Sequence, residues 1–344
     1  KNFTFRSLPT IRFLRSSSLI AMSKVQKTLV LLGVGVCMMF YRHQTNVSSL
    51  EPVSLHSRSA SFNRQYQQYM DRLDATLSHE RLQGVIEENK DYKLQYPFPH
   101  GRTQGLFPQD VLDAVTAEIP DSPVIDTKSK KKGCIKGDVK CYSASQQKFK
   151  NAFEDESVFG PATVAVFRKL KSPSFTKFLE NMTGIYGLIP DPEYRGSGIH
   201  QTLPGGYLGI HADFNLYEKY DNMHRRVNVF VFLNDDWKPE YGGALELWHR
   251  DLKSCGAKYL PIMNRFVVFS STDFSYHGQP HPLTAPPGRS RRSLALYYYT
   301  KTRPTSECVK GKCFTHHTTL FKKTFCDDCE ENTCRNISSA NFAR

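Results

Sequence analysis

A chain of 344 residues that is 39% hydrophobic and 23% charged, with 23 Phe and 17 Tyr, has a globular composition, which excludes a disordered, fibrous or low-complexity protein. The formal net charge is +13, but residues 1–60 and 127–150 each carry +7 and the last 44 residues carry +3, which leaves −4 for the other 216 residues. Because the basic residues gather in a leader, a loop and a tail rather than along a continuous groove, we expect no nucleic-acid partner.

Residues 1–60 are predicted to form a targeting or anchor segment followed by a linker. Residues 28–41 are an uncharged apolar run preceded by Lys24 and Lys27, a pattern typical of secretory targeting. As a helix this run would span about 21 Å, less than the roughly 30 Å of a bilayer core. We expect a short single-pass type II membrane anchor in the secretory pathway (endoplasmic reticulum or Golgi), with a cleaved signal peptide as the close alternative. An organelle transit peptide is a further alternative, because residues 1–21 contain Arg and Ser but no acidic residue.

Residues 61–195 are predicted to form a helical support region. Apolar residues recur at mostly helical spacing over residues 62–86, and residues 109–118 and 174–182 also have helical patterns. The Lys-rich stretch 127–140 is expected to be a loop.

After Pro190 the pattern changes to short segments rich in β-branched and aromatic residues, separated by turn clusters such as Pro204-Gly205-Gly206. The expected strands are residues 207–212, 227–233, 244–248, 265–270 and 293–300. Many short strands with Gly/Pro turns predict a β-sandwich or jelly roll, here with helices packed before it, and we place its core at residues 196–302.

The tail, residues 303–344, is rich in cysteine. It holds five of the nine cysteines, at positions 308, 313, 326, 329 and 334. A disulfide-stapled extension in an oxidising lumen is the favoured interpretation. Zinc is the alternative, with Cys308-x4-Cys313 and Cys326-x2-Cys329 as ligand pairs. Glycosylation sequons at Asn46, Asn181 and Asn336 agree with a secretory route.

His211, Asp213 and His277 are the candidate metal ligands. Residues 211 and 213 face the same side of an extended chain, so the imidazole and the carboxylate can converge on one ion. His277 follows the predicted strand 265–270 and supplies a third ligand. Two His and one carboxylate, with other coordination positions open, are the arrangement expected of non-haem Fe(II) oxygenases.

The strand after His277 carries a candidate anion-binding residue. Arg291, Ser293 and Ala295 share one face of this strand. An Arg followed by two small side chains leaves room for a small dicarboxylate, whose distal carboxylate the guanidinium can bind with two hydrogen bonds.

At these positions the chain resembles the 2-oxoglutarate- and Fe(II)-dependent dioxygenases, and in particular the prolyl 4-hydroxylase-type branch with its α-subunit-like catalytic domain. The segments that carry the resemblance are PGGYLGIHADF (204–214), RRVNVFVFLNDDWKPEYGGALELW (225–248), NRFVVFSSTDFSYHG (264–278) and RRSLALYYYT (291–300). They lie within about residues 200–301, under a third of the chain.

The resemblance implies a double-stranded β-helix that holds Fe(II) through His211, Asp213 and His277. It implies that Arg291 pairs with the C5 carboxylate of 2-oxoglutarate, that the products include succinate and CO2, and that L-ascorbate restores oxidised iron. Ser293 is expected beside Arg291 in the cosubstrate site. Tyr207 and Asn228 are expected to line the same pocket.

The chain also departs from the family pattern. Phe232 and Leu203 stand where oxygen-sensing prolyl hydroxylases have tyrosines, so cosubstrate binding is expected to depend more on Arg291. Arg289 is a rival for the role of Arg291. Three further histidines, His200, His249 and His281, are expected not to be metal ligands.

The resemblance implies hydroxylation of a substrate C–H bond, most simply of peptidyl-proline in a protein or peptide. The alternatives are an oxygenase acting on a glycan, a lipid or a small molecule, a zinc hydrolase using the same three ligands, and a binding module without activity. Neither the acceptor atom nor the oligomeric state follows from the sequence.

Overall fold

The computed structural model describes residues 58–120 and 140–324. The predicted leader, almost all of the Lys-rich loop and the last 20 residues of the tail lie outside these ranges. Within the described ranges, none of the helices is both long enough and apolar enough to cross a bilayer. The membrane anchor expected at residues 28–41 lies outside them and stays a prediction.

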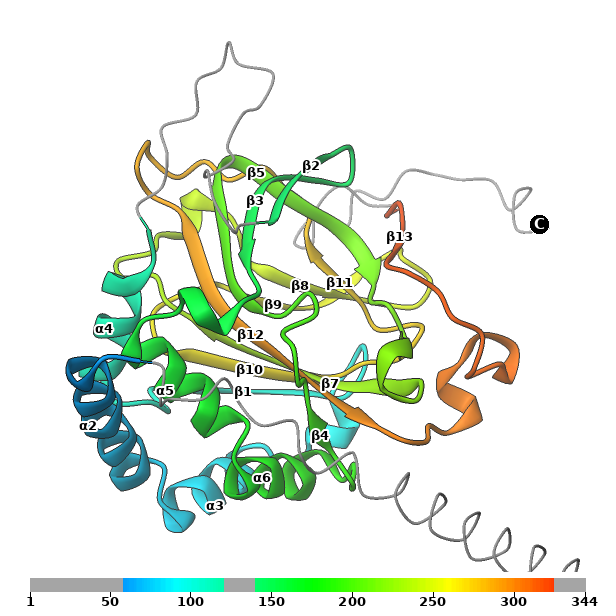
Figure 1. Ribbon diagram of the computed structural model, residues 1–344. Helices are drawn as coiled ribbons and strands as arrows, with labels where there is room; N and C mark the ends of the chain where they lie inside the picture. Colours follow the sequence, from blue (N-terminus) through cyan, green and yellow to red (C-terminus); the bar gives the residue numbers. More distant parts are fainter. Residues whose placement is uncertain (1–57, 121–139, 325–344) are drawn as a thin grey trace, which may run out of the picture. The chain divides into compact units, whose positions relative to one another are not determined.

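The α-helices of the described ranges lie on the outside of a curled sheet (Figure 1). They are α2 (Ala60–Thr76), α3 (His79–Glu88), α4 (Gln109–Glu118), α5 (Pro161–Leu170) and α6 (Pro173–Thr183). The helical pattern over residues 62–86 is divided into α2 and α3. The division lies at Ser78, whose hydroxyl accepts a hydrogen bond from the Arg81 N–H and caps α3.

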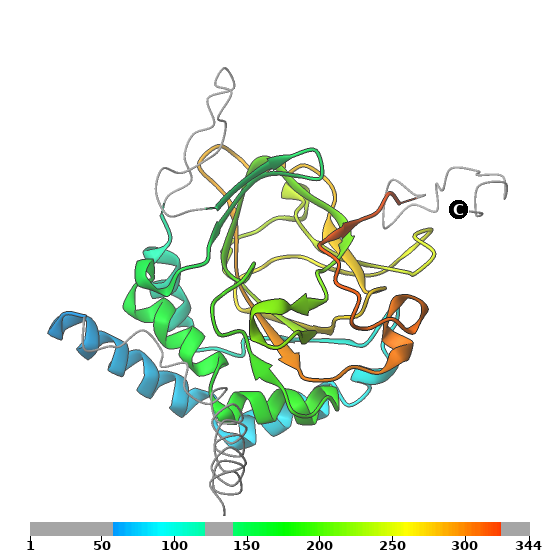
Figure 2. The ribbon, with the colours of Figure 1, turned by 45° about the vertical axis from the view of Figure 1, so that its right-hand side comes forward.

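The strands form one mainly antiparallel sheet. They are β1 (His100–Gln104), β2 (Lys140–Ala144), β3 (Gln147–Phe153), β4 (Ile189–Pro190), β5 (Gly198–Ala212), β6 (Leu216–Tyr217), β7 (Met223–Phe232), β8 (Leu245–Trp248), β9 (Cys255–Tyr259), β10 (Arg265–Ser270), β11 (Tyr276–Gln279), β12 (Arg291–Thr300) and β13 (Leu320–Phe321). The main path runs β1-β10-β7-β12-β5-β11-β8-β9, and β3 and β13 also pair with β5. The sheet curls into an open barrel, with helices along one side (Figure 2). The predicted jelly-roll architecture is confirmed, and the region expected to be helical also contributes β1, β2 and β3.

The curl depends on β5, which serves both halves of the barrel. Its first part, Gly198–Thr202, pairs with β12, whereas its last part pairs with β11. Between the two parts lies the Pro204-Gly205-Gly206 turn cluster, where Gly205 has a φ of +77°. A Cβ on Gly206 would lie 2.8 Å from the carbonyl oxygens of Leu203 and Lys148, so only glycine fits there. Gly/Pro bends of this kind let one strand pass from one half of a barrel to the other.

Side chains of the central strands alternate between a helix-facing core and the barrel interior. On β7, Val227, Val229 and Val231 join the core that includes the helices, while Phe230 and Phe232 point to the other side. This is the period-two pattern of a strand that is covered on both faces. The inward face of the barrel carries the polar residues considered next.

Candidate active site

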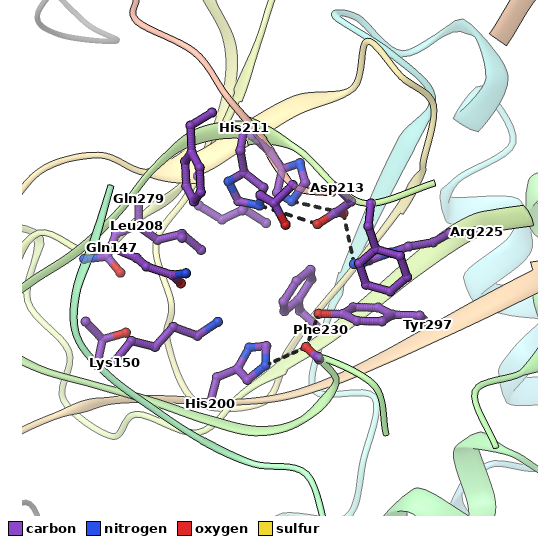
Figure 3. Close-up of a pocket in the computed structure, with 18 of the residues that line it drawn as sticks. Gln147, Lys150, His200, Leu208, His211, Asp213, Arg225, Phe230, Gln279 and Tyr297 are labelled. Atoms are coloured by element: carbon purple, nitrogen blue, oxygen red, sulfur yellow. Dashed lines mark hydrogen bonds and ion pairs between the residues drawn. The ribbon is translucent and has the colours of Figure 1, made fainter. Parts of the chain in front are cut away.

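Three buried side chains from β5 and β11 converge inside the barrel. His211 is paired with His277 across the two strands, and Asp213 follows β5 directly. The Nε2 atom of His211 lies 3.5 Å from Oδ1 of Asp213, and Nε2 of His277 lies 3.5 Å from Oδ2. The potential ligand atoms of all three residues lie within 4.8 Å of one another. The predicted metal ligands are therefore brought together at one point (Figure 3).

Backbone carbonyls orient both imidazoles. The Nδ1–H of His211 donates to the carbonyl of Gly209 (2.8 Å), and the Nδ1–H of His277 donates to the carbonyl of Ser275 (2.9 Å). Because a carbonyl oxygen only accepts, each Nδ1 carries the proton and each Nε2 presents a lone pair to the centre of the group. Burial lowers the pKa of His277 to about 4, which keeps this ring neutral. Two imidazoles and a carboxylate, with other coordination positions left open, suit Fe(II).

Two donors from β7 hold the carboxylate of Asp213. Asn228 donates from Nδ2 to Oδ2 (2.7 Å), and the guanidinium of Arg225 lies 2.9 Å from the same oxygen. Burial raises the pKa of Asp213, but the positive charge of Arg225 is the largest of the effects that oppose burial, and together they hold the pKa well below its usual range. Asp213 is therefore an anion in this structure, as a metal ligand has to be.

Arg291 enters the same cavity from β12. Its Nε–H donates to the carbonyl of Gly243 (2.6 Å), and its guanidinium carbon lies 4.9 Å from the centre of the Phe232 ring. Burial lowers the pKa of Arg291 to about 10, and in the part of the chain that the structure describes no carboxylate pairs with it. A buried cation without an anionic partner suits the carboxylate of a bound ligand. Phe232 stands where oxygen-sensing prolyl hydroxylases have a tyrosine. It therefore places an aromatic ring beside Arg291 but no hydroxyl group.

One cavity of about 290 Å³ contains both the metal-ligand group and Arg291. Thr202 lies in its wall, in register with Lys150 on β3 and with Arg291 on β12, so the three side chains form one row across adjacent strands. Lys150 points into the cavity (Figure 3). Burial lowers the pKa of Lys150 to about 8. Lys150 could not be predicted from local periodicity, because a register shift interrupts the alternating pattern of β3.

Residues 197–299 match the family model described as the 2OG-Fe(II) oxygenase superfamily. This segment is a 2OG-Fe(II) oxygenase domain. Together with the metal-ligand group, this match indicates a 2-oxoglutarate-dependent dioxygenase, a class of enzyme that uses Fe(II) and 2-oxoglutarate. The match contains the metal-ligand group and Arg291, and it leaves out the helices, β3 and the tail.

Several solved structures are similar to this chain. A prolyl-4-hydroxylase from Pseudomonas putida is 18% identical, with 64% of this chain and 100% of that chain covered and a TM-score of 0.43. A Trichoplax adhaerens prolyl hydroxylase in complex with a hypoxia inducible factor peptide fragment is 14% identical (72% and 96% covered, TM-score 0.41). HygX from Streptomyces hygroscopicus, with nickel, 2-oxoglutarate and hygromycin B bound, is 12% identical (66% and 90% covered, TM-score 0.39). No curated protein matches the sequence. Identities this low say nothing of a shared substrate.

Tyr207 does not line the cavity of the oxygenase domain, contrary to the prediction. Its hydroxyl donates to the carbonyl of Ser145 (3.0 Å), and Leu208 lines the cavity instead. The reason is a bulge in β5: the partners of His211 and Leu208 on β11 are only two residues apart, His277 and Gln279. One extra residue reverses the parity on which the prediction depended.

Ser293 and Asn228 are placed differently from the prediction as well. Ser293 lies on the same face of β12 as Arg291, but it is fully buried beside His200 and Phe232 rather than in the cavity wall. Asn228 is also absent from the wall and acts on the carboxylate of Asp213. Period two correctly predicts the face of a strand, but the packing of neighbouring strands decides which side chains reach the cavity.

The other candidate residues behave as expected. Arg289 lies outside the cavity, with its guanidinium 5.7 Å from the ring of Tyr241 and a hydrogen bond to the carbonyl of Asp235. His200 lines the cavity but donates from Nε2 to the carbonyl of Gly196 (3.0 Å). His249 stacks on Tyr96, and His281 lies at a separate hollow. None of these three histidines belongs to the metal-ligand group.

The tail contributes to the oxygenase site, which the sequence analysis did not foresee. Leu320 and Phe321 of β13 pair with Ala212 and His211 of β5. The Phe321 ring lies 5.5 Å from the imidazole of His211, and Phe321 lines the cavity together with Thr319. A strand of two residues has no sequence signal of its own, because its position depends on the edge that it joins.

Proposed function

We propose that this dioxygenase hydroxylates peptidyl-proline in a protein or peptide, using Fe(II), 2-oxoglutarate and O2 and releasing succinate and CO2. The use of Fe(II) and 2-oxoglutarate is supported by one cavity, which contains the metal-ligand group of His211, Asp213 and His277 together with Arg291. The proline part is supported by the resemblance of four segments between residues 204 and 300 to prolyl 4-hydroxylases.

Each part of the cavity has a distinct task. His211, Asp213 and His277 would hold Fe(II), which when bound supplies the redox chemistry that couples O2 and 2-oxoglutarate to oxidation of a C–H bond. Arg291 would bind the distal carboxylate of 2-oxoglutarate and so orient the cosubstrate along the barrel. Apolar side chains such as Leu208 and Phe230 line the cavity between them and exclude water.

The cavity continues into a wider groove of about 560 Å³. Glu154 and Arg195 line both spaces. A groove that leads to the metal-ligand group gives an extended peptide access to it.

We also propose a secretory-pathway location with residues 28–41 as the membrane anchor. The support within the described residues is the disulfide between Cys308 and Cys313, since such bonds persist in oxidising compartments. Because Cys308 and Cys313 are joined in this disulfide, they cannot serve as a pair of zinc ligands in the tail. Asn181 is exposed on α6 and accessible for glycosylation.

The experiment that tests the function is mass spectrometry of the full chain incubated with Fe(II), L-ascorbate and 2-oxoglutarate, with and without a pool of proline-rich peptides. We expect peptides that are one oxygen heavier at proline, with one succinate formed for each oxidation. His211→Ala should abolish both products, whereas His249→Ala, which removes a histidine outside the site, should not. Succinate without peptide oxidation would contradict the proline assignment and move the search to glycans, lipids or small molecules.

Cosubstrate binding is tested by a pair of arginine variants. Arg291→Ala should raise the KM for 2-oxoglutarate by at least about tenfold, because it removes a charge-assisted pair from a buried site. Arg289→Ala is the matched control and should leave this KM unchanged. The reverse result would show that the distal carboxylate binds at Arg289. Leaving out ascorbate should shorten the period of linear turnover if iron oxidation limits the enzyme.

A further inference from the structure

Arg195 is a cation of the cavity that has no charge partner among the residues the structure describes. The cavity wall contains four cationic side chains, Lys150, Arg195, Arg225 and Arg291, and two carboxylates, Glu154 and Asp213. Arg225 is paired with Asp213, and Glu154 is the carboxylate that most favours the charged form of Lys150. Arg291 faces the proposed cosubstrate.

Among the described residues, Arg195 makes no ion pair and no side-chain hydrogen bond. Its guanidinium lies 4.9 Å from the centre of the Phe214 ring and 5.1 Å from that of the Tyr217 ring. Aromatic contacts hold a guanidinium by its face and leave the N–H groups along its edge free to donate. Arg195 is only half-buried, so a ligand can reach that edge from the groove. The other charged residues that line the groove are Glu154, Asp155, Glu193 and Lys219, and Lys219 is paired with Glu193, so Arg195 is the cation of this lining that is left for an anionic ligand.

The loop that carries Arg195 is held in place before any ligand binds. Asp191 is fully buried, accepts hydrogen bonds from the Glu193 N–H (3.1 Å) and the Ser197 hydroxyl (2.8 Å), and so closes the loop on itself. Next to Arg195, the buried Tyr194 donates its hydroxyl to Glu156 (2.8 Å). A charged group on a fixed loop binds an anion with little loss of conformational entropy.

Arg195 is connected to the metal ligand Asp213 through the Phe214 ring and Arg225. The Phe214 ring that it contacts also lies 4.8 Å from the guanidinium carbon of Arg225, and Arg225 is the partner of Asp213. Arg195 also lines both the cavity and the groove. An anion bound there would lie where the cavity meets the groove, which Arg195 lines and Arg291 does not.

We propose that Arg195 binds a carboxylate of the substrate, so that the enzyme prefers acceptors with an acidic group next to the hydroxylated residue. This rests on the proposed function for the identity of the acceptor, but the subsite itself requires only the carboxylate. For a peptide, the carboxylate belongs either to a flanking Asp or Glu side chain or to the C-terminus.

The first test compares oxidation of matched proline peptides by the full chain. Peptides with Asp or Glu beside proline and an amidated C-terminus are compared with Asn or Gln peptides, each with an amidated or a free C-terminus. We expect kcat/KM to be about tenfold higher for peptides with the carboxylate, as for a hydrogen-bonded ion pair at a partly exposed site. Arg195→Gln should abolish this preference, and Arg195→Glu should favour Lys-flanked peptides. The arms with free and amidated C-termini identify the source of the carboxylate.

Arg250→Gln is the matched control, because the Arg250 guanidinium lies 3.5 Å from the centre of the Phe274 ring, outside the cavity and the groove. It should retain the preference. The KM for 2-oxoglutarate should be unchanged in both variants, which separates a substrate role from a structural one. Equal kcat/KM for acidic and neutral peptides in the wild-type chain would overturn the subsite while leaving proline hydroxylation intact.

A binding measurement keeps the subsite testable if no proline peptide is oxidised. Ligand-observed NMR on the Mn(II)-loaded chain would compare acetyl-Asp-Pro-amide with acetyl-Asn-Pro-amide. Tighter binding of the aspartyl probe, lost in Arg195→Gln and kept in Arg250→Gln, would support the subsite even though the proline assignment had failed. Equal binding of the two probes, or a preference that survives in Arg195→Gln, would overturn it.

Discussion

Asp213 shows how much of the site depends on residues that never touch a substrate. Its carboxylate is 8% exposed, yet it stays charged because Arg225 and Asn228 both donate to Oδ2. Arg225 also donates from Nε to Oδ1 of Asn228 (2.8 Å), so the two donors fix each other. Such partners of a metal ligand set its orientation and its basicity.

Asn228→Ala should weaken metal binding without unfolding the domain. The variant removes one donor to Asp213 and frees the side chain of Arg225, so we expect the affinity for Mn(II) to fall by about 10- to 100-fold. Isothermal titration calorimetry measures this directly. Asn234→Ala is the control, because Asn234 bonds to the carbonyls of Pro261 and Arg292, away from the ligands. Equal affinities in the two variants would show that Asn228 does not position Asp213.

At the scale of elements, the part of the tail before β13 is anchored through one buried carboxylate. Asp273 pairs with Arg303 (3.0 Å), accepts a hydrogen bond from the Val309 N–H (2.9 Å) and lies 3.2 Å from Nε2 of His317. Asn215 also accepts a hydrogen bond from the His317 N–H (3.0 Å). These contacts hold the tail so that the Phe321 ring lies beside the imidazole of His211. The anchor at Asp273 therefore helps to position a residue of the active site.

The anchor should weaken at alkaline pH. Burial disfavours the charged form of His317, but the carboxylate of Asp273, 3.2 Å from Nε2, outweighs burial and raises the pKa of His317 above its usual value of 6.5. Burial raises the pKa of Asp273, but the nearby His317, the hydrogen bond from the Val309 N–H and the charge of Arg303 outweigh burial and lower it, so Asp273 stays charged at neutral pH. The ion pair is therefore complete below about pH 6.5 and is lost as the pH rises through the raised pKa of His317.

Hydrogen exchange of the tail between pH 6 and 9, corrected for intrinsic rates, measures this effect. We expect protection of residues 315–322 to fall by about fivefold across that range, as for a coupling near 1 kcal/mol. In His317→Gln the protection should be lower at pH 6 and nearly independent of pH. A pH dependence that persists in this variant would assign the effect to another group.

At the scale of the whole molecule, the helices and the sheet share one core. Leu112 and Val115 of α4, Phe167 of α5 and Phe178 of α6 belong to the same buried cluster as Val229 of β7. The barrel interior, by contrast, contains polar groups that burial keeps neutral. His200 has its pKa lowered well below the usual value, and burial lowers the pKa of His224 and of His277 to about 4.

The metal-free protein should therefore lose stability as the pH falls from about 6.5 to 4. A buried neutral histidine contributes its full stability above its unfolded pKa of about 6.5 and loses it as the pH falls toward its lowered folded pKa. Each such histidine adds a slope of up to about 1.4 kcal/mol per pH unit to the free energy of unfolding. Urea unfolding at several pH values measures the slope.

His224→Phe isolates one of these contributions. Neither ring nitrogen of His224 has a hydrogen-bond partner among the described residues, so the substitution removes a titratable group without breaking a bond seen there. We expect a shallower slope of unfolding free energy against pH. His281→Phe, on an exposed loop, should leave the slope unchanged. An unchanged slope in His224→Phe would mean that this residue does not contribute to acid unfolding.

The sequence by itself determined several of the helices and strands and the residues of the metal-ligand group. Helix 109–118 and strand 265–270 have the predicted bounds, because periodicity and turn residues act locally. The group of His211, Asp213 and His277, and Arg291 in place of Arg289, also followed from residue type and spacing. The local sequence pattern is sufficient to predict where a side chain points when only the residue and its neighbours on the same strand decide its orientation.

Only the tertiary structure decided what completes the cavity. The bulge in β5 exchanged Tyr207 for Leu208, because a bulge depends on the pairing with β11. Lys150, Arg195 and Phe321 enter the cavity from segments far apart in the chain. Their positions result from strand pairing, loop packing and the anchor at Asp273. These are contacts between distant parts of the chain, which no local periodicity encodes.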